Sequence, residues 1–194
     1  MGNLELSLEK IGIPVKESYT YRDYALLPEG APYQLIGGKL IMTPAPGTFH
    51  QVVVIRLVER LLEYNAKEKA GQVLVAPVDV YLEERETYQP DIIFISRERL
   101  SIIEPARVAG PPDVVMEVLS PSTAYYDLKS KARIYAKHGV KEYWIVDPED
   151  KSIEVYTGQD GGLGLHQRVQ GKGKVSSLLL AEFAVEAAEV FAAL

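Results

Sequence analysis

Two stretches decide the fold that the sequence predicts: residues 89–95, Gln-Pro-Asp-Ile-Ile-Phe-Ile, and residues 112–119, Pro-Asp-Val-Val-Met-Glu-Val-Leu. Each is apolar at consecutive positions, which is typical of a central strand covered by helices on both faces. Each also carries an acidic side chain, Asp91 in the first stretch and Glu117 in the second. We therefore predict two buried, neighbouring strands with a carboxylate on each.

Helical and strand patterns on either side of these stretches extend the prediction to an α/β fold with a mixed sheet between helices. The predicted elements, in chain order, are a short helix from Thr20 to near Leu27, a hairpin of residues 33–36 and 39–42 around Gly37-Gly38, a helix over 48–69 stopped by Gly71, a strand over 73–82, strands over 91–95 and 114–119, a helix over 121–138, a strand over 142–146, a hairpin or meander around Gly161-Gly162, and an acidic amphipathic helix over 184–194.

The composition is that of an ordinary globular protein. With 194 residues, 47% hydrophobic and 25% charged, the chain fits one domain over residues 1–194. It has no cysteine, which excludes disulfides, zinc-thiolate sites and cysteine nucleophiles. The start does not resemble a signal peptide and no apolar stretch reaches membrane length, so we expect a cytoplasmic protein without membrane contact.

The net charge bears on nucleic-acid binding. A formal charge of -6 opposes indiscriminate attraction to a phosphate backbone, so any contact with nucleic acid must be local. A local group of basic residues does occur on and after the helix predicted at 121–138: Lys129, Lys131, Arg133, Lys137 and Lys141. A solvated helix face is the alternative interpretation of this group.

Glu117 and Lys131 are the candidate charged pair of the interior. A carboxylate inside an apolar strand costs several kcal/mol unless a cation or hydrogen bonds compensate it. At 100° per residue, Lys131 falls between Ile134 and Tyr135 in the apolar sector of its helix, from where its ammonium can reach Glu117 and hold water or a phosphate. The alternatives are a Glu117 that reaches solvent and a helical pair between Lys131 and Asp127.

Asp91 and Glu117 together indicate a divalent-cation site. Mg²⁺ prefers oxygen ligands, retains several waters, and can activate water for phosphodiester hydrolysis. Asp79 is a third acid on a predicted strand and a candidate outer partner, unless it is only a polar residue on a half-exposed strand. The sequence contains no phosphate-binding Gly-x-x-x-x-Gly-Lys loop, His-Glu-x-x-His motif or Gly-x-Ser-x-Gly elbow.

Four motifs together resemble the Uma-type endonucleases: Gln-Pro-Asp at 89–91, Glu-Val-Leu-Ser-Pro-Ser-Thr at 117–123, Asp127 with Lys131 and Tyr135, and Glu-Tyr-Trp-Ile-Val-Asp-Pro at 142–148. The similarity runs from about Tyr19 to the C-terminal helix. Because that family belongs to the PD-(D/E)XK nuclease superfamily, the resemblance implies a restriction-endonuclease-like mixed central sheet flanked by helices, with an N-terminal hairpin and a C-terminal hairpin plus helix. It also implies Mg²⁺-dependent hydrolysis, with Mn²⁺ as an alternative.

The same resemblance implies roles for individual residues. Asp91 would be the aspartate of the PD motif and Glu117 the acid of the (D/E)XK motif, both as metal ligands. Leu119 stands where that motif usually has lysine, so Lys131 would supply the ammonium. His50 and Gln34 are candidate substrate-positioning residues; His50 could instead be a solvated histidine at a helix start. Gln34 and Gly37 stand where the family usually has Glu and Asp.

Three classes of function fit these observations. The first is a Mg²⁺-dependent endonuclease that acts on nucleic acid, DNA in our interpretation, through Asp91, Glu117 and Lys131. The second is a nuclease-fold protein without catalysis that binds nucleic acid or regulates, a class favoured by Gln34 and the acidic net charge. The third is an assembly protein in which the carboxylates are structural. Since two sites most simply cut both strands of a duplex, we also expect a homodimer.

Overall fold

The two apolar strands pair side by side at the centre of a six-stranded sheet. In the computed structural model, which describes residues 8, 13–120, 125–159 and 161–193, β6 (Ile92–Ser96) pairs antiparallel with β8 (Val114–Val118). β8 pairs parallel with β9 (Glu142–Asp147) on its other side. The complete sheet, in spatial order, is β11 (Gly162–Gln170), β10 (Ser152–Gln159), β9, β8, β6 and β3 (Gly71–Val75).

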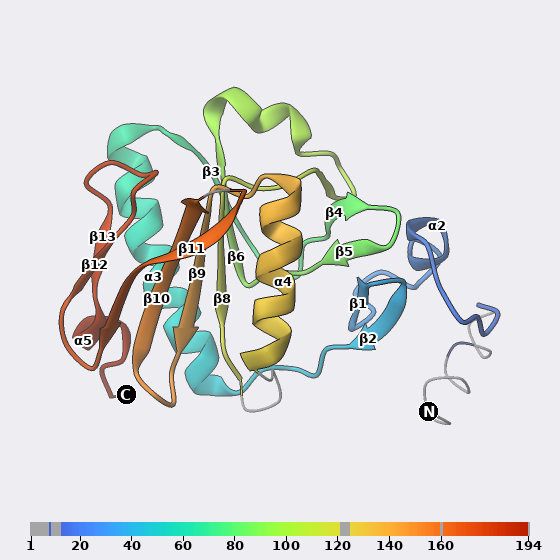
Figure 1. The fold of residues 1–194 in the computed structure, drawn as a ribbon, viewed down its shortest axis with the longest axis horizontal. Helices are drawn as coiled ribbons and strands as arrows, with labels where there is room; N and C mark the ends of the chain where they lie inside the picture. The colour runs from blue at the N-terminus through green and yellow to red at the C-terminus, as the bar shows by residue number, and fades with distance from the viewer. Residues whose placement is uncertain (1–7, 9–12, 121–124, 160, 194) are drawn as a thin grey trace.

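A long helix covers each face of this sheet, as Figure 1 shows. Alternate side chains of the central strands, Ile92, Phe94, Met116 and Val118, pack with Val53, Leu57 and Leu61 of α3 (Thr48–Glu68). The residues between them, Ile93, Ile95 and Val115, pack on the other face with Tyr135 of α4 (Tyr125–His138). Because strands direct successive side chains to opposite faces, a continuous apolar run supplies both cores. The predicted mixed sheet between helices is confirmed.

A second sheet of short strands stands beside the first (Figure 1). Its order is β2 (Lys39–Met42), β1 (Tyr33–Ile36), β5 (Glu86–Tyr88), β4 (Val80–Glu83) and β7 (Val108–Ala109). The predicted β1–β2 hairpin is confirmed, and its turn has φ values of 57° at Gly37 and 76° at Gly38, the left-handed pair that a two-residue turn requires. The predicted short helix is α2 (Tyr21–Tyr24), which begins after Thr20 and ends before Leu27.

The strand predicted over residues 73–82 is wrong in one respect. The segment forms two strands, β3 and β4, which belong to different sheets. Pro77 lies between them and lacks the N–H that a continuous ladder would need. Gly71 begins β3 and does not stop α3; a Cβ atom there would collide with the carbonyl oxygen of Ile95. The left-handed residue that ends α3 is Lys69, with φ of 51°.

The C-terminal helix predicted over residues 184–194 exists but is shorter than expected. β13 (Ala184–Glu186) pairs with β12 (Lys174–Ser176), and in the described part of this range, up to residue 193, the helix is the single turn α5 (Ala187–Val190). Val185 and Ala187 are buried while Glu186 between them is exposed, a period of two that suits a strand. The predicted C-terminal hairpin is confirmed as β10 and β11. The predicted start of the 121–138 helix, at residues 121–124, lies outside the described residues.

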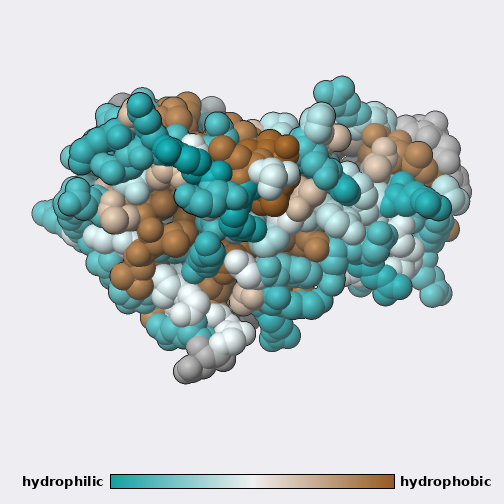
Figure 2. All heavy atoms as spheres, turned by 90° about the horizontal axis from the view of Figure 1, so that it is seen from above, coloured by the Kyte–Doolittle hydropathy of each residue, from teal (hydrophilic) through white to brown (hydrophobic). Residues whose placement is uncertain are grey.

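Exposed apolar side chains are scattered over the surface. The large exposed hydrophobic residues include Leu26, Ile55, Leu62, Leu165 and Leu178. Seen from above, hydrophobic atoms occur in several separate patches surrounded by hydrophilic ones (Figure 2). Within the described ranges, no helix has both the length and the apolar character needed to span a membrane. The homodimer stays a prediction.

Asp113, which is fully buried, is the centre of a charge cluster at the start of β8. Its carboxylate lies 2.7 Å from Lys141 Nζ and 2.9 Å from an Arg99 guanidinium nitrogen. It also accepts hydrogen bonds from the backbone N–H and hydroxyl of Ser96, at 2.8 and 2.9 Å. Burial raises the pKa of Asp113, but the two cations and Ser96 outweigh it and hold this pKa at about 2. The cluster therefore connects β8 to the end of β6 and to the start of β9.

Asp113→Asn tests this cluster. We expect the substitution to lower the free energy of unfolding at pH 7 by about 2 kcal/mol, because the neutral amide is fully buried and loses the ion pairs with Lys141 and Arg99. Since the folded-state pKa lies below the ordinary value, this stabilisation is present above pH 3.8 and is lost as the pH falls towards 2. Urea unfolding across this pH range measures both effects. Asp150→Asn, at an exposed turn, is the control, and an equal loss in both variants would contradict the assignment.

Candidate active site

Asp91 stands directly opposite Glu117 across the central strand pair. The register that pairs Ile92 with Met116 and Ile93 with Val115 places these two acids in the next pair along the ladder. Residues two apart on a strand share a face, so Glu117 shares the face of Val115, which packs towards α4. Glu117 is 7% exposed, whereas Asp91 is half-buried. The fold thus brings together two carboxylates that are 26 positions apart in the sequence, from 91 to 117.

Lys131 provides the cation that buried Glu117 requires. Its Nζ lies 2.8 Å from Glu117 Oε1, and the hydroxyl of Tyr135 donates to the same oxygen at 3.0 Å. The ammonium also lies 5.6 Å from the centre of the Tyr88 ring, an attractive cation–π arrangement. Lys131 is 5% exposed, so it points inward as the helical projection predicted. The alternative pair with Asp127 involves a side chain outside those that the structure describes.

The electrostatics of this pair of acids favour a cation. Burial raises the pKa of Glu117; Lys131 lowers it in part, and the nearby charge of Asp91 raises it further. Burial and the charge of Glu117 also raise the pKa of Tyr135 and of Tyr143. Two negative charges on one buried face repel each other, and a bound cation would remove that penalty.

His50 contacts Asp91 from the first turn of α3. Its Nε2 lies 3.0 Å from the carbonyl oxygen of Val118 and 3.3 Å from Asp91 Oδ2, while the Val118 N–H donates to the same carboxylate oxygen at 2.8 Å. His50 is 7% exposed, so it is not the solvated helix-start histidine of the alternative interpretation. Burial lowers its pKa, but the interaction with Asp91 outweighs burial and raises the pKa above 6.5.

Gln34 and Asp79 both contact the residue two positions before Asp91. Gln34 is buried on β1, and its Oε1 accepts a hydrogen bond from the Gln89 N–H at 3.2 Å. Asp79 precedes β4 and accepts hydrogen bonds from Tyr24 and from the Gln89 side chain. The structure therefore brings Asp91, Glu117, Lys131 and His50 together. Gln34 is linked to them through the backbone of Gln89. The described side-chain contacts of Asp79 are with Tyr24 and the Gln89 side chain, not with the two carboxylates.

The sequence did not predict the contribution of Tyr88. This residue lies on β5, a three-residue strand that the sequence did not indicate. Its hydroxyl donates to Glu86 at 2.6 Å, and its ring meets Tyr135 edge to face. Thr87 and Tyr88 are β-branched and aromatic, which favours a strand, but three residues are too few to show the alternating pattern of a strand.

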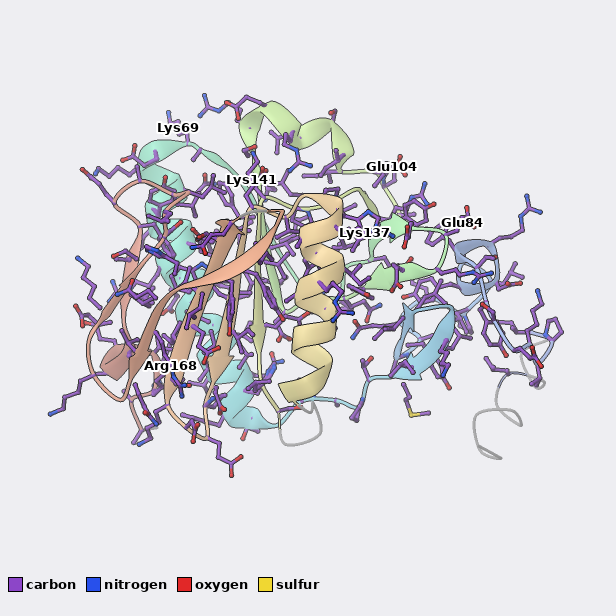
Figure 3. All side chains as sticks on the ribbon, in the orientation of Figure 1. Lys69, Glu84, Glu104, Lys137, Lys141 and Arg168 are labelled. Atoms are coloured by element: carbon purple, nitrogen blue, oxygen red, sulfur yellow. The ribbon has the colours of Figure 1, made fainter. Side chains whose placement is uncertain are left out.

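Part of the predicted basic group is engaged in ion pairs at the far end of α4. Lys137 lies 2.8 Å from Glu83, and Lys141 lies 2.7 Å from Asp113. Figure 3 shows both lysines near the C-terminal end of the helix. These two charges are neutralised by the protein itself, which agrees with a structural interpretation for them.

The donor set fits Mg²⁺ better than Zn²⁺. Within the described ranges, no cluster of three or more His, Asp or Glu side chains gathers around one point. Zinc normally requires three or four protein ligands, whereas Mg²⁺ is often bound by one or two carboxylates and retained waters. Asp91 and Glu117, unlike the fully compensated Asp113, have a surplus of negative charge. They are therefore the residues that would hold such an ion.

Comparisons with known proteins agree with the resemblance to the Uma-type endonucleases. A family model, Uma2, described as "Putative restriction endonuclease", matches residues 19–188. No curated protein matches the chain. A solved structure described as a "putative nuclease belonging to DUF820" from Anabaena variabilis is 20% identical, with a TM-score of 0.74 over 89% of this chain and 97% of that chain. At this identity the similarity establishes the fold alone.

A double-mutant cycle tests the buried ion pair. Lys131→Met leaves the Glu117 carboxylate without its cation and should lower the free energy of unfolding by about 3 kcal/mol. Adding Glu117→Gln should recover about 1–3 kcal/mol of this loss, because the uncompensated charge is removed. Chemical denaturation at pH 7 measures all four corners of the cycle. The control is Lys137→Met on the exposed face of α4; a Lys131→Met loss no larger than the control would contradict the pairing.

The pKa of His50 provides a separate test of its contact with Asp91. NMR titration should give a value above 6.5 in the native protein. Asp91→Asn should bring the pKa below that of the native protein, because burial then acts without the opposing carboxylate. By linkage, protonated His50 stabilises the fold below pH 6.5, and this stabilisation is lost as the pH rises through the folded-state pKa. An unchanged His50 pKa in Asp91→Asn would refute the contact.

Proposed function

The chain belongs to the Uma2 family, and we propose that it is a Mg²⁺-dependent endonuclease that hydrolyses phosphodiester bonds of DNA. The observation that carries the proposal is the buried ion pair of Glu117 and Lys131, at 2.8 Å, on the strand pair that sets Asp91 opposite Glu117. An inward lysine beside two facing carboxylates combines a cation site with an electrostatic group for phosphate. The family and the fold support a nuclease.

Asp91 and Glu117 would hold the metal ion. When bound, Mg²⁺ polarises a phosphoryl oxygen and lowers the pKa of a bound water; Mn²⁺ suits the same oxygen ligands and is the alternative. Both carboxylates are held in a fixed orientation by the chain. Asp91 Oδ2 accepts the Val118 N–H, and Glu117 Oε1 accepts from Lys131 and Tyr135.

Lys131 would position the attacking water or the scissile phosphate. An ammonium has three hydrogen-bond donors, and the bond to Glu117 uses one of them. Because the group is buried, its attraction for the charge that develops on phosphate is screened less than it would be in water. His50 orients Asp91 through its Nε2, and Gln34 orients the segment before Asp91 through the Gln89 N–H.

Nicking of supercoiled plasmid DNA tests the proposal. We expect cleavage that requires Mg²⁺ or Mn²⁺ and is abolished by a chelator. Asp91→Asn, Glu117→Gln and Lys131→Met should each reduce the rate at least about 100-fold, since each removes a group that acts on the developing charge. The matched control is Lys137→Met, on the same helix at the opposite end from the predicted chemistry, which should retain the native rate.

The assay also has decisive negative outcomes. Equal cleavage by the native protein and the three variants, each shown to be folded by thermal unfolding, would refute the site. Metal binding measured by calorimetry gives a readout independent of turnover. Asp91→Asn and Glu117→Gln should weaken Mn²⁺ binding, while Lys131→Met should strengthen it or leave it unchanged, because that variant retains both carboxylates.

A nuclease-fold protein without catalysis is the second candidate, and one observation favours it. Lys131 and Tyr135 both bind Glu117 Oε1, so this carboxylate is compensated without a metal ion. Gln34, which cannot serve as an anionic ligand, points the same way. Salt-sensitive DNA binding, with no cleavage under any divalent cation, would support this candidate. A homodimer would bring two sites to one duplex, and sedimentation with and without DNA tests that arrangement.

A further inference from the structure

A cavity of about 700 Å³ lies apart from the two carboxylates, beside α2. Its walls come from α2 and the loop after it, from the β3–β4 connection, from Gln89, and from the loop between η1 (Arg97–Ile102) and β7. The volume is in the range of small-molecule sites. Leu74 in its wall packs with the core that contains Val115 and Tyr135, so the cavity is on the α4 side of the sheet.

The carboxylate of Asp79 lines one wall of the cavity and is held by hydrogen bonds. Asp79 Oδ1 accepts from the Tyr24 hydroxyl at 2.7 Å and from Gln89 Nε2 at 2.9 Å. Gln89 Nε2 also lies 3.2 Å from the Tyr24 hydroxyl, which closes a triangle of polar groups. These bonds involve Oδ1 and hold the Asp79 carboxylate in place. A carboxylate has about four acceptor positions on its two oxygens, so it can accept from further N–H donors.

A guanidinium also lines the cavity, since Arg107 comes one position before Val108, which pairs with Val80 next to Asp79. Arg107 is sandwiched between the rings of Tyr21 and Tyr81, with its Cζ 4.5 Å from each ring centre. Glu104, labelled in Figure 3, accepts from Arg107 Nε at 2.9 Å. The planar fork of Arg107 is therefore held before any ligand arrives, and Nε is only one of its five donors.

We propose that this cavity binds a guanine base of the nucleic-acid substrate. Guanine carries two neighbouring donors, N1–H and the 2-amino group, which suit the Asp79 carboxylate. It also carries the O6 and N7 acceptors that arginine binds in bidentate fashion. Adenine has N7 but lacks N1–H, the 2-amino group and O6, and cytosine has neither set. Because the first set is on the pairing edge, the base must be unpaired or extruded from the duplex.

The position of the cavity suits a base near the scissile phosphate. Gln89 lines the cavity and Asp91 is two residues later, a separation of at most about 7 Å between Cα atoms. The guanine site rests on the proposed function, since it takes nucleic acid as the substrate. It goes beyond that function by assigning a base preference to residues that are not part of the carboxylate pair.

Calorimetry with mononucleotides, without divalent cations, tests the site independently of cleavage. The native protein should bind guanosine 5′-monophosphate at least tenfold more tightly than the adenosine, cytidine or uridine monophosphates. Asp79→Asn should reduce that affinity at least tenfold. It should also favour xanthosine 5′-monophosphate, which has a carbonyl oxygen in place of the 2-amino group, because the new amide can donate there. A merely structural role for Asp79 would not reverse the preference.

Three comparisons complete the test. Asp150→Asn, the same change at an exposed turn, should bind as the native protein does, and Arg107→Lys, which keeps the charge without the fork, should bind guanosine monophosphate more weakly. Equal affinity for all four nucleotides, or native guanosine monophosphate affinity in Asp79→Asn, would overturn the guanine site. Asp91→Asn separates the two proposals, because this variant should lose cleavage and keep the affinity for guanosine monophosphate. Loss of that affinity would place the nucleotide at the carboxylates and overturn the guanine site.

Discussion

The ion pair of Glu117 and Lys131 is the constraint on which the arrangement of the site depends. An uncompensated carboxylate at the centre of a sheet would cost several kcal/mol, so α4 must pack with Lys131 facing β8. The 2.8 Å contact and the hydroxyl of Tyr135 on the same oxygen fix the rotation of the helix about its axis. The same rotation brings apolar residues of α4 onto the sheet, and packing and electrostatics therefore favour one orientation.

The two Pro-Asp sequences at 90–91 and 112–113 have different environments and, we infer, different uses. Asp113 is met by Lys141, Arg99 and Ser96 and contributes to stability. Asp91 faces a second acid, Glu117, and among the described side chains the basic groups in contact with the pair are Lys131 and His50. A buried acid with matched cations needs nothing further, whereas two acids with one permanent cation leave a surplus charge that suits a metal ion.

The sequence predicted the elements whose pattern is long and regular. The central strands, α3, both hairpins and the inward direction of Lys131 followed from apolar runs, helical spacing and turn glycines. It did not predict β5 and β7, which have three and two residues and too few positions to show a period. The C-terminal helix is shorter than predicted because strand pairing with β12 prevailed over the helical propensity of an alanine-rich segment.

The sequence by itself determined that two apolar strands carry acids, that one lysine of the following helix faces inward, and that the motifs are those of an endonuclease family. These properties are local, because they depend on the period of a single element. Tertiary structure decided that Asp91 is opposite Glu117, that His50 reaches Asp91 from another layer, and that Asp79 and Arg107 border one cavity. Such contacts depend on strand register and on the pairing of distant segments, which no single stretch of sequence specifies.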